Sequence, residues 1–387
     1  MSESAAKGKR LPRGHQTLRP ISDRYMLDAA RGSRVLQLPE LPYRPQDPPN
    51  YRPGIGVIGC GGISYHHLRA YRDARYNVVA LCNRHPEPAE ERRRQFFPKA
   101  RVFSDYKKLL SLDSVEVVDI ATHPHERPPL IEAALRAGKH VLSQKPFVVD
   151  LDVGERLVDL AGELGLKLAV NQNGRWAPHF AWMRHAVKHR FFGRMVSAHF
   201  AMHWDHSWVA GTPFDDVRHL ILFDFGIHWF DVLGCLMLGR RPTRVYASTA
   251  RASDQTAKPP LLAQALVEYG DTQASMVFGG NTKQGAHDDT ILVGTNATVM
   301  SSGYDLGSQT ITVSTRRGSA SPHLEGSWFP GGFHGAMAEL LRSIVSNRQP
   351  IHAAKNNLKS LALCFAACAS ADDHEPKVPG SVRRLPE

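Results

Sequence analysis

Short apolar segments alternate with charged or amphipathic segments between residues 54 and 173, and this alternation restricts the fold more than any other feature of the chain. Segments 77–83 and 115–122 are rich in β-branched residues and predict strands, whereas 86–97 has the charge pattern of a surface helix. Segment 115–122 is almost wholly apolar, as expected of a central strand that is buried on both faces. Strands and helices that alternate at short spacing predict right-handed βαβ units in a parallel sheet.

A glycine-rich turn, Gly59-Cys60-Gly61-Gly62-Ile63-Ser64, follows the first of these strands and opens a helix. Gly59 permits a tight turn, Gly61 lets the backbone approach a diphosphate, and the helix N-terminus supplies free N–H donors. Ser64 occupies the third small position of the G-x-G-x-x-G pattern. In this βαβ context the turn predicts a doubly wound Rossmann domain over residues 53–173 that binds a dinucleotide.

The choice between NAD and NADP depends on the end of the second strand, Asn83-Arg84. An acidic residue usually binds the ribose hydroxyls of NAD about 20 residues after the glycines. Asn83 lacks the charge that repels a 2′-phosphate, and Arg84 can bind one. The sequence therefore predicts NAD or NADP, with a preference for NADP or for dual use. An Arg84 that stacks on adenine or faces solvent is the alternative.

Beyond residue 190 the pattern changes to β-rich runs separated by glycine, aspartate and asparagine turns, such as 196–204 and 244–252. These runs predict a mostly antiparallel sheet. One long helical stretch over 215–238 interrupts them, and two further helical runs close the chain. The predicted fold class is α/β: a Rossmann doubly wound parallel sheet, followed over residues 174–387 by an α+β domain with a large, mostly antiparallel open sheet.

Residues 1–52 are expected to form an extended arm, because prolines at 42, 45, 48, 49 and 53 exclude regular structure near its end. The chain has a formal net charge of +11, and residues 1–53 contain ten basic against five acidic residues. These basic residues are scattered, with no zinc-finger or helix-turn-helix pattern beside them, so we expect a solvated arm and no nucleic-acid partner. A basic surface also attracts anionic ligands such as phosphorylated cofactors.

The composition supports a globular protein of two domains, with 387 residues of which 42% are hydrophobic and 22% charged. No run of ~18 apolar residues predicts a membrane span, so no membrane partner is expected. The five cysteines include no C-x-x-C pair, and Cys364 and Cys368 are expected in the core, one helical turn apart, rather than at a metal. These features predict a reduced, cytoplasmic protein without a metal site.

Two further segments carry polar side chains at positions where they could act on a substrate. Lys145 follows a predicted parallel strand at its carboxyl end, where ligands bind in open α/β sheets. Asp224 and His228 are four residues apart and share one face if the stretch is helical. Because burying polar groups is costly, this pair needs a partner or a function. A solvated lysine and a structural hydrogen-bonded pair remain the alternatives.

Several segments in this order and spacing resemble the Gfo/Idh/MocA family of nicotinamide-dependent oxidoreductases, from about residue 54 to the C-terminus. They are GCGGIS, IAT-HPH, EAALRAGKHVLSQKPF, NGRWAP and DFGIHWFD. The resemblance implies that Lys145 is the substrate-side lysine of the family's E-K-P motif and that His228 of D-x-x-x-H is the proton acceptor. Two departures are Gln144 in place of the motif's glutamate and Asn83 in place of an acidic residue.

The resemblance also implies further contacts with the cofactor. Arg175 and Pro178 match an R-x-x-P element near the hinge and the nicotinamide, and residues 122–125 match the loop that borders the nicotinamide ribose. The full set of expected cofactor contacts is Gly59, Gly61, Gly62, Ile63, Ser64, Asn83, Arg84, Thr122, His123, Pro124, His125, Gln144, Lys145, Asn173 and Arg175.

The substrate is expected to lie against segment 203–216, which combines aromatic and polar side chains just before the candidate catalytic pair. Aromatic faces suit the C–H faces of sugar rings, and polar groups suit hydroxyls. Trp204 and Trp208 in the core or at a subunit contact are the alternative. The expected substrate contacts are Lys145, Arg175, Trp176, His203, Trp204, Asp205, Trp208, Asp224 and His228.

The predicted function is an NAD(P)-dependent oxidoreductase that transfers hydride between a carbohydrate or polyol carbinol and nicotinamide. His228, oriented by Asp224, would accept the hydroxyl proton, and Lys145 would stabilise the alkoxide. Two alternatives implied by relatives are a redox-assisted glycoside-cleaving enzyme and a cofactor-sensing, non-enzymatic regulator. The retained Lys145, Asp224 and His228 disfavour the regulator. The resemblance further implies a homodimer or homotetramer formed through the C-terminal sheet.

Overall fold

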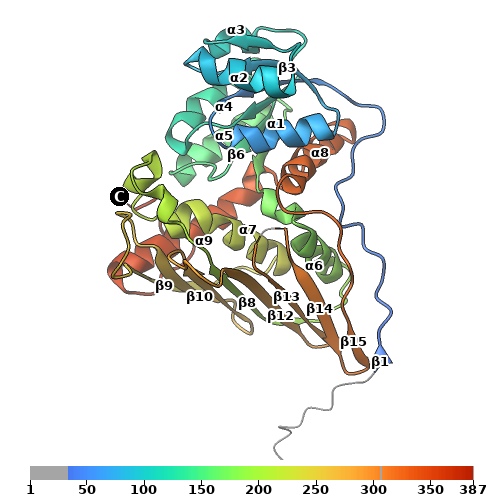
Figure 1. Ribbon diagram of the computed structural model, residues 1–387, viewed down its shortest axis with the longest axis vertical. Helices are drawn as coiled ribbons and strands as arrows, with labels where there is room; N and C mark the ends of the chain where they lie inside the picture. The colour runs from blue at the N-terminus through green and yellow to red at the C-terminus, as the bar shows by residue number, and fades with distance from the viewer. Residues whose placement is uncertain (1–33, 306, 387) are drawn as a thin grey trace, which may run out of the picture.

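The computed structural model describes residues 34–305 and 307–386, which form two sheets with helices packed on them (Figure 1). A six-stranded parallel sheet has the order β4-β3-β2-β5-β6-β7, and a nine-stranded sheet has the order β1-β15-β14-β13-β12-β8-β11-β10-β9. The second sheet is antiparallel except where β11 pairs with β8 and β1 with β15. The predicted fold class, a Rossmann sheet followed by a mostly antiparallel sheet, is confirmed.

The first sheet has the strand order of a Rossmann fold, with helices on both faces. Its strands are β2 (Gly54–Ile58), β3 (Asn77–Cys82), β4 (Arg101–Phe103), β5 (Val117–Ile120), β6 (His140–Gln144) and β7 (Leu168–Asn171). One face packs against α1 (Ser64–Asp73), α2 (Pro86–Phe96) and α8 (Gly331–Val345). The other face packs against α3 (Tyr106–Leu110), α4 (Arg127–Arg136) and α5 (Leu151–Glu163). Helix α8, which follows the strands of the second sheet in the chain, therefore returns to the first sheet.

The second sheet is covered by helices on one face only (Figure 1). Its strands are β1 (Arg34–Val35), β8 (Met195–His203), β9 (Arg244–Ala250), β10 (Leu262–Glu268), β11 (Gln273–Gly279), β12 (His287–Gly294), β13 (Ala297–Gly303), β14 (Thr310–Thr315) and β15 (Gly318–Ala320). The covering helices include α6 (Pro178–Lys188), α7 (Ile227–Leu236) and α9 (Ala354–Asp373). Burial alternates along the strands, so that Ala265 is buried and its neighbour Leu266 is exposed on the uncovered face.

The helix predicted over 215–238 is broken into separate turns. These are the 3₁₀ turn η4 (Pro213–Asp216), the π-helical turn η5 (Leu220–Phe225) and then α7. Gly226 at the junction donates its N–H to the carbonyl of Ile221 at 2.7 Å, the wide spacing of a π-turn. A Cβ at Gly226 would lie 2.6 Å from the oxygen of Leu222, so the turn requires glycine. As a result Asp224 belongs to the π-turn and His228 to α7.

The described part of the arm, residues 34–52, runs extended along the molecule and packs on the same chain (Figure 1). Asp47 accepts hydrogen bonds from Tyr76 and from His334, and Arg44 pairs with Glu325 at 2.8 Å. The prediction for residues 1–33 lies outside the described residues. Within the described part of the chain, no helix has the length and apolar character needed to cross a membrane.

Candidate active site

The candidate site is a groove at the carboxyl edge of the parallel sheet, where several of the expected residues lie just beyond the end of a strand. Asn83 follows β3, Thr122 follows β5, and Lys145 follows β6. One cavity of about 390 Å³ extends from this edge to the second domain. Of the expected site residues, Gly61, Gly62, Ile63, Thr122, His123, Pro124, Gln144, Lys145, Asn173, Trp204, Trp208, Asp224 and His228 line it. A second cavity of about 750 Å³ shares Thr122 and adds Gly59, Asn83 and Arg84.

The glycine turn leaves backbone donors free at the floor of the groove. Gly59 has a φ of +95°, and a Cβ there would lie 2.8 Å from the carbonyl carbon of Ala121, so only glycine fits. A Cβ at Gly61 or Gly62 would meet nothing within 4 Å, which leaves room for a ligand. The N–H groups of residues 61–63 make no backbone or side-chain hydrogen bond within the described residues. Free amides beside open space at a helix start fit the diphosphate of a dinucleotide.

Two of the expected cofactor residues support the turn. The side-chain oxygen of Asn83 accepts the N–H of Cys60 at 3.0 Å, so this amide holds the loop. Ser64 is buried and donates its hydroxyl to the carbonyl of Gly61 at 2.6 Å. Arg84, by contrast, projects into solvent and pairs with Glu126 at 2.8 Å, at the rim of the larger cavity.

Arg127, at the start of α4, fixes the backbone around Lys145. Its buried guanidinium donates to the carbonyl oxygens of Thr122 at 2.8 Å, Gln144 at 2.6 Å and Lys145 at 3.1 Å, and also to that of Pro146. Burial lowers the pKa of Arg127 to about 9, so it remains charged at neutral pH. Arg127 could not be identified from the sequence, because its partners are backbone atoms that become neighbours only when β5 and β6 pair.

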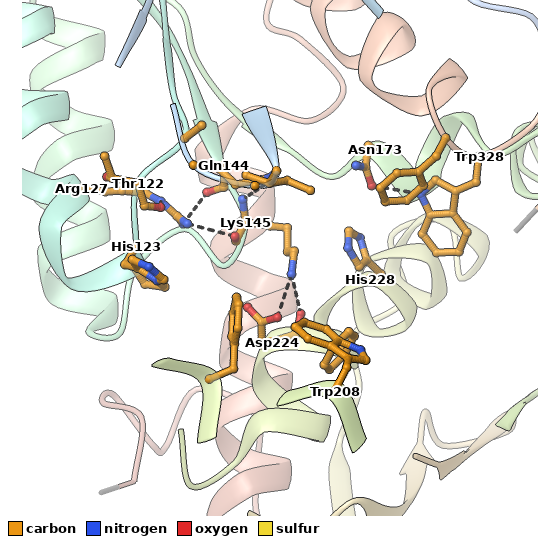
Figure 2. Close-up of a pocket in the computed structure, with 18 of the residues that line it drawn as sticks. Thr122, His123, Arg127, Gln144, Lys145, Asn173, Trp208, Asp224, His228 and Trp328 are labelled. Carbon is orange, nitrogen blue, oxygen red and sulfur yellow. Dashed lines mark hydrogen bonds and ion pairs between the residues drawn. The ribbon is translucent and has the colours of Figure 1, made fainter. Parts of the chain in front are cut away.

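Lys145 bridges the two domains. Its ammonium donates to the carboxylate of Asp224 at 3.2 Å and to the backbone oxygen of Asp224 at 2.8 Å. Both side chains are only 14% exposed, so the pair is largely removed from water. Figure 2 shows the Lys145 side chain pointing at Asp224, with the His228 ring beside them. The expected pairing of Asp224 with His228 is replaced by this ion pair, because the π-turn separates Asp224 from the face of α7.

His228 lines the cavity with a neutral imidazole. Burial and the nearby Lys145 ammonium hold the pKa of His228 well below its usual range. Its Nδ1 is enclosed and has no hydrogen-bond partner among the described residues, so Nε2 is the nitrogen that a ligand in the cavity can reach. The ring packs edge-on against Trp328, with centroids 5.4 Å apart. The indole N–H of Trp328 donates to Asn173 at 3.0 Å, which ties this wall to the end of β7.

A buried network of five side chains lies beneath Lys145. Gln144 accepts the backbone N–H of Lys145 at 2.7 Å, and its amide nitrogen lies 3.1 Å from Nε2 of His67. Asn171 also places its amide nitrogen 3.2 Å from this His67 nitrogen. Since both neighbours are donors, Nε2 of His67 accepts, and Nδ1 carries the proton that it donates to Asp119 at 2.7 Å. Tyr71 donates to the same Asp119 oxygen at 2.7 Å.

Aromatic side chains form the outer wall of the cavity. Trp208 packs edge-on against Phe214 and Phe225, with centroids 5.7 and 6.3 Å apart. Lys145 Nζ lies 6.0 Å from the centre of the Phe225 ring. Five further aromatic residues line the cavity and were not among the expected site residues: Phe214, Phe225, Trp229, Trp328 and Phe329. The aromatic character of segment 214–229 was a signal for three of them, whereas Trp328 and Phe329 come from a distant loop.

Six expected residues lie outside both cavities, and one of them is Ser64, which supports the glycine turn. Arg175 is buried, and its guanidinium is held by Asp231 at 2.5 and 2.6 Å and by the carbonyl of Ile351. Its role is therefore to join η2 (Asn173–Trp176) to α7. Trp176 packs against His352, at 5.0 Å between centroids. His203 stacks on His287 at 4.5 Å, and Asp205 accepts the N–H of Ser207 at 2.9 Å. His125 is exposed on η1 (Pro124–Glu126).

Two family models match the chain. One is the oxidoreductase family with an NAD-binding Rossmann fold, over residues 54–172, and the other is the GFO/IDH/MocA C-terminal domain, over residues 180–300. The N-terminal domain is thus an NAD-binding Rossmann domain, and the resemblance noted in the sequence is confirmed.

Curated relatives include sugar and polyol dehydrogenases. A D-apiose dehydrogenase of Paraburkholderia graminis is 30% identical over 203 residues, which are 52% of this chain and 53% of that protein. An inositol 2-dehydrogenase of Rhizobium meliloti is 28% identical over 204 residues, 52% of this chain and 59% of that protein. The chain spans about half the length of the curated relatives it matches.

Among solved structures, an oxidoreductase from Agrobacterium radiobacter in complex with NAD+, L-tartaric acid and magnesium has a TM-score of 0.76 at 22% identity, and the match covers 86% of this chain and 99% of that one. Levoglucosan dehydrogenase in complex with NADH and levoglucosan has a TM-score of 0.74 at 17% identity, with 86% and 100% covered. These structures share the fold of this chain.

Replacing Arg127 tests its support of the Lys145 loop. In Arg127→Lys the ammonium cannot reach all four carbonyl oxygens, so we expect the free energy of unfolding to fall by ~1.5–3 kcal/mol, the value of a hydrogen bond to a charged group. Urea denaturation measures this change. Arg136→Lys is the matched control, because Arg136 is on the same helix and is 63% exposed. An equal effect of the two substitutions would contradict the support role.

Proposed function

Because this chain belongs to the Gfo/Idh/MocA family of NAD-binding oxidoreductases, we propose that it is an NAD(P)-dependent dehydrogenase that oxidises a CH–OH group of a carbohydrate or polyol. The observation that carries the proposal is the convergence of Lys145, Asp224 and His228 on one cavity, beside the free amides of residues 61–63. The apiose and inositol dehydrogenases among its relatives support the substrate class.

A bound nicotinamide would supply the hydride acceptor, and the side chains of this chain would handle the proton and the charge. His228, neutral because of its burial, would accept the hydroxyl proton at Nε2. Lys145 would donate a hydrogen bond to the same oxygen and stabilise the negative charge that develops there. Asp224 would hold the Lys145 ammonium in place, rather than orient the imidazole, since its carboxylate lies 3.2 Å from Nζ.

The walls of the cavity support a small hydroxylated substrate. Trp208, Phe214 and Phe225 present aromatic rings suited to the C–H faces of a sugar, while Lys145 and His228 supply polar groups for hydroxyls. Four expected substrate contacts lie outside both groove cavities and are withdrawn from the proposal: Arg175, Trp176, His203 and Asp205.

Self-association and a cytoplasmic location complete the proposal. The uncovered face of the second sheet exposes large apolar side chains, Val196, Tyr246, Leu266 and Met300, which supports a homodimer or homotetramer formed through this sheet. All five cysteines are unpaired, as expected in a reducing compartment.

The activity is tested by incubating the purified protein with NAD+ or NADP+ and a panel of pentoses, inositols and sugar acids. We expect reduced nicotinamide to accumulate in proportion to the substrate consumed. Release of an aglycone from aryl glycosides without net reduced nicotinamide would contradict the dehydrogenase and support the glycoside-cleaving alternative.

Substitution of the two proposed catalytic groups separates chemistry from cofactor binding. Lys145→Met and His228→Asn are each expected to lower kcat by ~10²–10⁴-fold, because positioned acid–base groups contribute that much. Fluorescence titration should show that NAD+ binds either variant with an affinity within about threefold of the parent protein. Lys359→Met and His189→Asn, both exposed and outside the cavity, are the matched controls. Full activity in either active-site variant would contradict the assigned role.

The pH profile of kcat/KM tests the neutral state of His228. A base must be unprotonated to act, and the depressed pKa keeps His228 unprotonated below the usual histidine value of ~6.5. Activity should therefore persist as the pH falls through ~6.5, with the acid limb at a lower pH. An acid limb centred at or above ~6.5 would show that a group other than this buried imidazole limits the reaction.

Arg84 is proposed to favour NADP by binding its 2′-phosphate. Arg84→Ala should raise KM for NADP by ~10–100-fold, as a lost charge-assisted hydrogen bond implies, and leave KM for NAD within about twofold. Glu126→Gln frees Arg84 from its ion pair and should lower KM for NADP. Equal changes in both KM values would instead indicate that Arg84 stacks on the adenine.

A further inference from the structure

A further cavity, of about 430 Å³, lies away from the groove, between the arm, α6 and α8. It shares no lining residue with either groove cavity. Five of its side chains are basic and one is acidic: Arg44, Arg184, Lys188, Arg342, Arg348 and Glu339. We call it the arm cavity. Its volume is within the range of cavities that bind small molecules, about 300–1,000 Å³.

Most of the charged groups in the arm cavity already have partners. Arg348 donates to both carboxylate oxygens of Glu339, at 2.6 and 2.8 Å. Arg342 donates to Gln46 at 2.9 Å, and Arg44 pairs with Glu325 at 2.8 Å. The one acidic side chain that lines the cavity is therefore occupied by Arg348.

Arg184 is the exception. Its Nε is enclosed, and its guanidinium has no hydrogen bond or ion pair with any of the described residues. Burial lowers the pKa of Arg184, and the cation behind it, Arg175, is already paired with Asp231. Removing a charged guanidinium from water without a partner is costly, so an unpaired one in a cavity needs an explanation. An anion bound in the cavity supplies it.

Two neighbours on α6 reinforce this charge. Lys188 is exposed at the C-terminal end of the helix and has no ion pair with a described residue. Burial and the nearby Arg184 and Lys188 lower the pKa of His185 to about 4, so His185 is neutral at physiological pH and adds a polar group without charge. Among the charged groups that line the cavity, Arg184 and Lys188 are thus the two cations without a partner in the described part of the chain.

We propose that the arm cavity binds a small metabolite through a phosphate or carboxylate group held by Arg184 and Lys188. A guanidinium presents paired N–H donors in a planar fork that matches two oxygens of such a group, and an ammonium adds a point charge. Trp176 and Tyr43 also line the cavity and supply aromatic surface beside these cations. This site is separate from the groove, where backbone amides rather than cations face the proposed diphosphate.

Thermal unfolding of the full chain with saturating NAD+, so that the groove is filled, tests the proposal. The probes are inorganic phosphate, a hexose phosphate and citrate, with sodium chloride at equal ionic strength as the salt control. A ligand that binds only the native state raises the midpoint. We expect at least one probe to raise it for the parent protein and for Arg156→Met, which removes an exposed arginine on α5, but not for Arg184→Met.

Without any probe, Arg184→Met should be at least as stable as the parent protein, because it removes a partly buried charge that has no partner among the described residues. Titration calorimetry should show that Lys188→Gln weakens probe binding several-fold, which keeps the proposal testable if Arg184→Met does not fold. If the hexose phosphate binds more tightly than inorganic phosphate, the ligand is a phosphorylated metabolite. If citrate binds most tightly, the ligand is a carboxylate. No binding of any probe up to ~10 mM, or equal binding by the parent and both cavity variants, would overturn the proposal.

Discussion

The ion pair between Lys145 and Asp224 is the contact on which the candidate active site depends. Lys145 extends from the carboxyl edge of the parallel sheet, and Asp224 belongs to the π-turn of the second domain. A largely buried ion pair is stable only if further hydrogen bonds compensate its loss of water. The backbone oxygen of Asp224 provides one such bond, and Arg127 fixes the loop that carries Lys145. The pair therefore defines where the two domains meet and where charge can be placed in the cavity.

Gln144 shows how this chain accommodates a departure from its family. Its amide accepts the backbone N–H of Lys145 and donates towards His67, whose other nitrogen donates to Asp119. A glutamate at this position would place a carboxylate oxygen against the lone pair on Nε2 of His67. The His67 ring would then need a proton on Nε2 to avoid repulsion between the two acceptors. The Lys145 ammonium donates its hydrogen bond to Asp224 instead, so this bond does not depend on a carboxylate at position 144.

Local features of the sequence predicted much of the fold and part of the site. The apolar runs predicted the strands of the parallel sheet, and the turn at 59–64 predicted the free amides. Both features can be read from residues that are close together in the sequence. The partner of Asp224 could not be predicted, since a glycine that widens one turn separates it from His228. Arg127 and Trp328 act on atoms brought close only by tertiary packing. The surroundings of Arg175 could not be predicted for the same reason, because Asp231, which holds its guanidinium, lies 56 residues further along the chain in α7.

A crystal structure of the protein with NAD+ and a polyol that it oxidises tests the central claim most directly. We predict the diphosphate on the amides of residues 61–63, and one substrate hydroxyl within hydrogen-bond distance, ~3 Å, of both Lys145 Nζ and His228 Nε2. A dinucleotide bound elsewhere, or a substrate hydroxyl in contact with neither side chain, would contradict the account.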